Sequence, residues 1–114
     1  MDNCLLKKEV YKIQDIYYKK KYINAIKNDN INEAKKLFER RKNVLFILID
    51  NTEEMLLLKY INENEYIQIL NSYMTFYDLM RKNYATLLYY GCGFFNRMYR
   101  DYGWDIYNSY LKSI

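Results

Sequence analysis

Hydrophobic side chains recur every three to four residues along nearly the whole chain, which is the spacing of an α-helix. The alternation of apolar and polar residues that is typical of a strand is hard to find. Pro does not occur, and the three Gly residues stand at positions 91, 93 and 103, so little in the sequence interrupts a helix. The pattern therefore predicts an all-α protein, with residues 1–114 folded as a single helical domain.

The first half of the chain predicts two helices joined by a short turn, the first over about 3–28 and the second over about 33–49. Asn32 is the predicted N-cap of the second helix, because an Asn side chain accepts a hydrogen bond from a free backbone N–H. The stretch 44–49 is apolar on all sides, which predicts that it is the most buried part. The side chains expected to face inward are Leu6, Val10, Ile13, Tyr17, Ile23 and Ile26 in the first helix, and Ala34, Leu37, Phe38, Leu45 and Leu48 in the second.

The polar residues 50–52 are expected to break the second helix, with Thr52 as the cap of a short third helix that ends near Ile61. A longer fourth helix is expected to start near Asn64. Its Tyr and apolar positions step alternately by four and three residues, which is the spacing of an a/d seam and continues in register to Met98. The members of this seam are Tyr66, Leu70, Tyr73, Tyr77, Met80, Tyr84, Leu87, Gly91, Phe94 and Met98.

Glycines mark the C-terminal part of the chain. Gly91 and Gly93 either break the fourth helix or admit another backbone close to it. Gly103 ends this stretch, and a short last helix is expected over about 104–112. The whole pattern predicts a compact antiparallel bundle of four main helices plus a short C-terminal helix.

Tyr is strongly over-represented, with fifteen residues in a chain of 114. A Tyr ring buries well, but its hydroxyl needs a hydrogen-bond partner, and Tyr is enriched at protein interfaces. Two interpretations of the seam stay open: an internal core stripe, or a surface through which the chain forms a homo-oligomer.

Catalytic and metal chemistry find little support in the sequence. His does not occur, which removes the commonest acid–base group and metal ligand. The Ser residues therefore have no His base to activate them, and no Gly-rich phosphate loop is present. Cys4 and Cys92 are far apart and are expected to be reduced and buried. We expect a protein that is not an enzyme and that holds no cofactor or metal.

Positive charge is concentrated in the first part of the chain. Residues 1–43 hold twelve Lys and Arg against six Asp and Glu, a net charge of +6, whereas residues 44–114 have a net charge of −2. Tyr rings lie among the lysines, a combination that suits single-stranded nucleic acid. A solvated helix face and an acidic protein partner are the other interpretations. The candidate nucleic-acid contacts are Lys19, Lys20, Lys21, Arg40, Arg41 and Lys42.

Lys, Asn, Ile and Tyr make up nearly half of the chain, and their codons consist largely of A and T. Together with the small size, this composition favours a virus, phage or mobile element as the source. Charged residues begin too early for a signal peptide, and the longest weakly polar run, 85–95, falls short of the ~20 residues of a membrane span. We expect a cytoplasmic protein, in the host cell if viral, with no membrane partner.

The segment 97–107 contains Gly103, Trp104 and Asp105, with Tyr107 three residues after the Trp. It resembles the BH2 segment of the Bcl-2 family, in which a Gly-Trp-Asp turn is followed by an aromatic residue at that spacing. Viral members of that family are all-α proteins that bind host helices in a groove and block death or innate signalling. The resemblance implies such a groove beside Trp104.

These observations predict a small interaction module that binds a host protein and inhibits or redirects it. Interface energy concentrates in Tyr, Trp and Arg, so the C-terminal cluster of these residues is the expected contact surface. The candidate partner-binding residues are Arg97, Tyr99, Arg100, Tyr102, Trp104, Tyr107 and Tyr110. Nucleic-acid binding through the basic N-terminal helices and a Bcl-2-like inhibitor are the alternatives.

Overall fold

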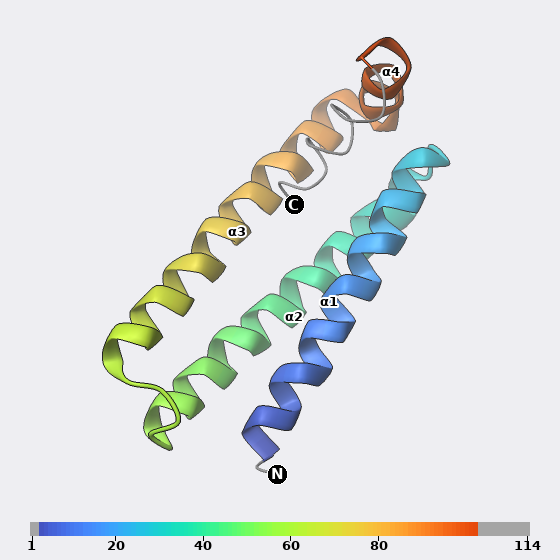
Figure 1. The fold of residues 1–114 in the computed structure, drawn as a ribbon. Coiled ribbons are helices and arrows are strands. Elements are labelled where there is room, and N and C mark those ends of the chain that lie inside the picture. The colour runs from blue at the N-terminus through green and yellow to red at the C-terminus, as the bar shows by residue number, and fades with distance from the viewer. Residues whose placement is uncertain (1–2, 103–114) are drawn as a thin grey trace.

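The computed structural model describes residues 3–102, which form four helices and, within that range, no strand (Figure 1). The helices are α1 (Asn3–Lys27), α2 (Ile31–Leu57), α3 (Glu63–Tyr90) and α4 (Cys92–Tyr102). The all-α prediction is confirmed for this part of the chain.

The three long helices run antiparallel in sequence order, and α4 lies at the end where α3 stops (Figure 1). α1 and α3 each pack on α2 and touch each other much less. The Cα radius of gyration is 16.0 Å, with extents of 49 × 23 × 22 Å. A compact domain of this length has a radius of about 13 Å. The fold is therefore more elongated than the compact bundle that the sequence predicts.

Both turns between the long helices close in the same way. Asp29 and Lys59 adopt the left-handed conformation, with φ of 56° and 61°. In each turn the residue after the left-handed one donates its backbone N–H to the carbonyl oxygen five positions earlier in the chain, at 2.9 Å. This is the hydrogen bond of the Schellman motif. Asn30 then serves as the N-cap of α2, because its Oδ1 accepts the backbone N–H of Glu33 at 3.2 Å. The cap lies two residues before the predicted Asn32.

α2 is one continuous helix, so the predicted break at 50–52 and the separate third helix are wrong. Asn51 and Thr52 are 4% and 2% exposed, and their side chains bond within the helix. The Thr52 hydroxyl donates to the backbone oxygen of Leu48 at 2.8 Å. The Asn51 amide lies 3.7 Å from the Met55 sulfur. A Thr hydroxyl that is bonded to the preceding turn is compatible with a continuing helix, and here it does not cap a new helix.

α3 begins with a capping box and ends at a glycine. Asn62 accepts the backbone N–H of Glu65 at 2.8 Å, and the Glu65 carboxylate accepts the backbone N–H of Asn62 at 3.3 Å. Gly91 ends the helix with φ of 74° and ψ of 179°, a conformation open essentially to Gly alone. Of the two roles predicted for Gly91, the structure shows the helix break, because no atom lies within 4 Å of a Cβ built there.

The core lies where the four helices meet. Met80 and Leu87 of the predicted seam are both 0% exposed, and its residues Tyr73, Tyr77 and Tyr84 pack against the core. This part of the seam therefore faces the chain's own interior, as the core-stripe interpretation expects. The buried cluster consists of Tyr22, Ala25, Ile26, Ala34, Leu37, Phe38, Leu45, Met80, Leu87, Cys92 and Phe95.

The inward face predicted for α1 is wrong in its N-terminal half. Four of the six residues expected inside are 44–66% exposed, whereas Ile26, nearer the C-terminal end, is fully buried. Asp15 has turned inward instead, because a buried cation on α2 gives it a partner. The exposed four are Leu6, Val10, Ile13 and Tyr17.

The apolar stretch 44–49 of α2 is also less enclosed than predicted. Phe46 and Ile47 are 42% and 38% exposed, while Val44, Leu45 and Leu48 are buried. α2 has neighbours on only some of its sides at this level, so a helix that is apolar all round keeps part of its surface open.

Candidate functional site

A partly buried ion pair connects the three long helices. Arg41 of α2 is 2% exposed, and its Nε donates to the Oδ1 of Asp15 of α1 at 2.7 Å. Its guanidinium lies over the ring of Phe76 of α3, 4.6 Å from the centroid. Its Nη1 is buried and has no hydrogen-bond partner within residues 3–102. Arg41, one of the candidate nucleic-acid contacts, is therefore buried, and its side chain points inward to Asp15.

An open groove lies beside this ion pair, between α1 and α3. One part of it has a volume of about 310 Å³ and a mostly apolar lining, with Leu45 and Leu48 of α2 among its lining residues. An adjoining hollow of about 360 Å³ shares Lys12, Ser72 and Tyr73 with the first. The two hollows therefore form one depression, here called the α1–α3 groove. Its further lining residues are Lys8, Asp15 and Ile16 from α1, and Gln68, Ile69 and Phe76 from α3.

The two walls of the groove meet toward the C-terminal ends of the helices. There the Tyr22 hydroxyl of α1 donates to the Oδ1 of Asn83 of α3 at 2.9 Å, and both side chains are buried. The groove is therefore open along the N-terminal halves of α1 and α3 and closes about two helical turns further on. Within it, burial and the negative charge of Asp15 raise the pKa of the Tyr73 hydroxyl.

The charge of the groove is positive on the α1 side. Asp15 is neutralised by Arg41. Lys8 and Lys12 project from the same wall, and the structure shows no ion pair to either of them within residues 3–102. The rim of the α1–α3 groove consequently carries two uncompensated ammonium groups above an apolar floor.

A second open surface lies on the opposite, outward side of α1. Leu6, Val10, Ile13 and Tyr17 follow one another at spacings of four, three and four residues, so they share one face of the helix. They are 51%, 44%, 66% and 51% exposed. Their span of eleven residues corresponds to about 16 Å of helix. This row is called the α1 apolar stripe below.

The remaining basic candidates point in several directions. Neighbouring residues on a helix are about 100° apart, so Arg40 faces solvent, Arg41 faces the core and Lys42 faces a third direction. Lys42 pairs with Glu39 at 2.8 Å, and this hydrogen bond raises the pKa of its ammonium. On α1, Lys20 and Lys21 are exposed and Lys19 is half-buried. The Lys21 ammonium lies 4.6 Å from the centroid of the Tyr17 ring.

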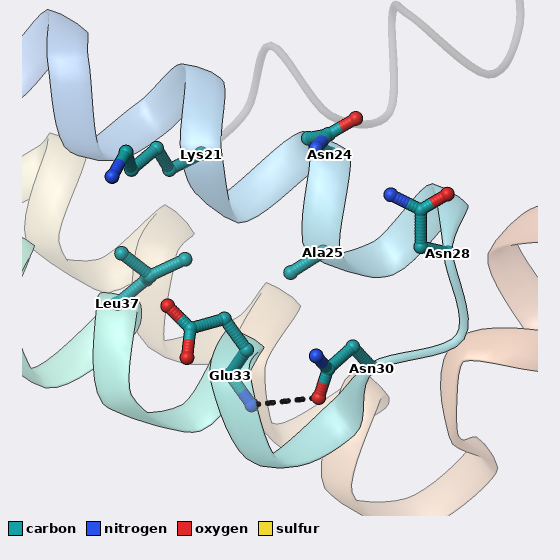
Figure 2. Close-up of a pocket in the computed structure, with 7 residues that line it drawn as sticks. All are labelled: Lys21, Asn24, Ala25, Asn28, Asn30, Glu33 and Leu37. Atoms are coloured by element: carbon teal, nitrogen blue, oxygen red, sulfur yellow. Dashed lines mark hydrogen bonds between the residues drawn. The ribbon is translucent and has the colours of Figure 1, made fainter.

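A polar pocket of about 230 Å³ lies where the α1–α2 hairpin closes (Figure 2). Ala25 and Leu37 give it an apolar part, and three Asn side chains surround it. The Glu33 carboxylate lies among them and balances the charge of Lys21, so the pocket offers no net charge to an ion. We assign it no ligand. Its full lining is Lys21, Asn24, Ala25, Asn28, Asn30, Glu33 and Leu37.

The C-terminal partner-binding candidates are only partly within the described residues. Arg97 and Arg100 of α4 are exposed, and Arg100 lies 3.2 Å from the Asp101 carboxylate. Tyr99 and Tyr102 belong to α4 as well. Trp104, Tyr107 and Tyr110, the predicted helix over 104–112 and the Gly-Trp-Asp turn lie outside the described residues. The contact surface and the Bcl-2-like groove predicted there stay predictions.

Exposed aromatic residues at the α3–α4 junction were absent from the predicted sites. Tyr89 and Tyr90 are 82% and 60% exposed, with ring centroids 4.7 Å apart. The ring of Phe94 stacks on Tyr90 at 5.1 Å. The groove residues were absent too, although the spacing of Lys8, Lys12 and Ile16 by four residues places them on one side of a helix and could have indicated a shared surface.

Within residues 3–102 no group of three or more His, Cys, Asp or Glu side chains is placed to hold a metal ion. In the same range no helix combines the length and the apolar character needed to cross a bilayer. Neither a family model, nor a curated protein, nor a solved structure matches this chain in the comparisons with known proteins.

Proposed function

We propose that this chain is a non-catalytic protein-interaction module that binds an acidic protein of a host cell and inhibits or redirects it. The observation that carries the proposal is the α1 apolar stripe. Single exposed apolar residues are ordinary on protein surfaces, whereas a contiguous apolar patch marks a binding surface. Here four such side chains share one face of one helix over about 16 Å.

The partner's chemistry follows from the charge around the stripe. α1 contains seven Lys against two acidic residues, a net charge of +5. A partner that covers the stripe must bring an apolar surface with acid groups at its rim, because like charges facing each other across an interface cost binding energy. A second copy of α1 facing the stripe would meet its own lysines, which disfavours self-association through this surface.

A double variant tests the stripe. Val10→Gln with Ile13→Gln replaces two of its exposed side chains, and Ile67→Gln with Met74→Gln is the matched control because these α3 residues are similarly exposed, at 52% and 44%. Both pairs should leave the free energy of unfolding within about 0.5 kcal/mol of the parent. Tagged proteins are used to capture partners from nuclease-treated host lysate, with bound proteins quantified by mass spectrometry.

The stripe variant should capture about 5- to 30-fold less partner than the parent, while the control variant captures as much as the parent. This is the effect expected when truncated interface residues contribute about 1–2 kcal/mol to binding. Equal capture by the parent and both variants, or equal loss from both variants, contradicts the proposal.

Nucleic-acid binding is a second candidate, favoured by the contact between the Lys21 ammonium and the exposed Tyr17 ring, which places a cation beside a stacking surface. It predicts retardation of a single-stranded probe that weakens steeply with salt. Replacing Lys20, Lys21 and Arg40 by Gln should abolish that retardation. A parent protein that retards neither single- nor double-stranded probes at low salt excludes this candidate.

A further inference from the structure

We infer that the α1–α3 groove is a docking site for a single amphipathic helix of a partner protein, with apolar residues on the inserted face and acidic residues on the flank next to α1. The inference deepens the proposed function, on which it rests, by assigning a second surface and the class of its occupant.

The shape of the groove suits a helix. Its walls run from Lys8 to Ile16 on α1 and from Gln68 to Phe76 on α3, which corresponds to about 12 Å, or two turns, on each side. α1 and α3 both lie against α2, and a helix seated between them would become the fourth long member of a bundle. Such a helix inserts residues at spacings of three and four, as helices do in apolar grooves.

The lining of the groove provides the apolar contact. Ile16, Leu45, Leu48, Ile69 and Phe76 bring aliphatic and aromatic groups from three helices to one depression. Ser72 stands exposed in the middle of the α3 wall and is small, so it leaves room for an inserted side chain. Burying apolar surface is the main source of affinity in a contact of this kind.

Charge decides which helix fits. Arg41 neutralises Asp15, so the α1 wall presents the positive charges of Lys8 and Lys12. A helix with Asp or Glu at two positions one turn apart on that flank would meet both ammonium groups. The α1 helix of a second copy carries a net charge of +5 and would be repelled, which argues for an acidic partner over a homodimer.

The test is a selection from displayed helical peptides of about 14 residues, in which apolar residues are fixed at helical spacing and the flanking positions are randomised. We expect Asp and Glu to be enriched on one flank. The selected peptide should bind Ser72→Trp at least about tenfold more weakly than the parent, because the indole fills the groove. Asn71→Trp, an exposed neighbour on the outward side of α3, should bind it like the parent.

Charge reversal supplies the second measurement. Lys8→Glu with Lys12→Glu should weaken the acidic peptide by about 2- to 30-fold and shift a repeated selection toward Lys and Arg flanks. Lys35→Glu with Lys36→Glu makes an equal charge change at exposed positions of α2. This control should leave the affinity for the acidic peptide and the outcome of the selection unchanged.

Failure to enrich any peptide, enrichment without an acidic flank, or binding that Ser72→Trp leaves intact would overturn the inference. Dimerisation of the parent that Ser72→Trp abolishes would assign the groove to a second copy and would also overturn it. These outcomes are separable from failure of the proposed function, because the stripe variants leave the groove unaltered.

Discussion

The ion pair between Arg41 and Asp15 makes a strong prediction about stability. Replacing Asp15 by Asn keeps the size of the side chain but removes one of its two acceptor oxygens and leaves the Arg41 cation without a counter-charge. Arg41 is 2% exposed and its Nη1 already has no partner among the described residues, so the guanidinium has little access to alternative acceptors. Removing one partner of a buried pair costs about 3–5 kcal/mol.

That cost must be discounted, because the Asp15 side chain is 23% exposed and water can reach its side of the pair. We therefore expect Asp15→Asn to lower the free energy of unfolding by about 2–4 kcal/mol, a large share of the 5–15 kcal/mol typical of a domain. Urea denaturation followed by far-ultraviolet circular dichroism measures the change, with the m-value unaltered if only stability is affected.

Two further variants define the interpretation. Asp78→Asn removes the partner of Arg81 in an exposed pair at 3.8 Å and should cost less than about 0.5 kcal/mol. Asp15→Leu combined with Arg41→Met replaces the pair by apolar groups and should recover most of the lost stability. If Asp15→Asn is as mild as Asp78→Asn, the pair does not hold a desolvated charge and the reasoning is wrong.

Two other variants and a titration give independent checks. Gly91→Ala should destabilise the protein by about 1–3 kcal/mol, because the backbone conformation of Gly91 is strained for Ala. Gly93→Ala should stabilise it by about 0.5–1 kcal/mol, because Gly93 lies within α4 and a Cβ there meets no other atom. Equal effects of the two substitutions in thermal unfolding would contradict the helix break at Gly91. Burial raises the pKa of the Cys92 thiol above its usual 9.0 and that of the Tyr73 hydroxyl above its usual 10.0. The folded state therefore holds these protons more tightly than the unfolded state, so the free energy of unfolding should decrease as pH rises from about 9 through the folded pKa values. Denaturation at stepwise pH measures this slope, which Cys92→Ala should reduce and which a rise in stability over the same range would refute.

The elements that were predictable from sequence are those defined by local chemistry. Asn62 with Glu65 forms a capping box from neighbouring residues, and Gly91 ends a helix through its own backbone freedom. Thr52 shows the limit of such reasoning, since the same side chain that caps a helix also bonds to the preceding turn inside one.

The orientation of α1 was not predictable because it depends on a distant residue. Asp15 faces inward only because Arg41, 26 positions away, lies opposite it. With Asp15 inside, Leu6, Val10, Ile13 and Tyr17 turn to the surface. The α1–α3 groove was not predictable for the same reason. It depends on how three helices are spaced relative to one another, and the periodicity within a single helix does not show that spacing.

The contact between α4 and the first hairpin has a consequence for the order of folding. The Asn96 amide donates to the backbone oxygen of Ile26 at 3.1 Å and to the Asp29 carboxylate at 2.7 Å, so it joins residues about seventy positions apart. Contacts of such sequence separation close large loops and form late, whereas the α1–α2 hairpin needs only a short turn. During synthesis the hairpin can therefore assemble before α4 has been made. Its α1 stripe would then be available to a partner while the rest of the chain is still unfolded. Pulsed hydrogen exchange should show protection of α1 and α2 amides before those of α4, and simultaneous protection would exclude this sequence of events.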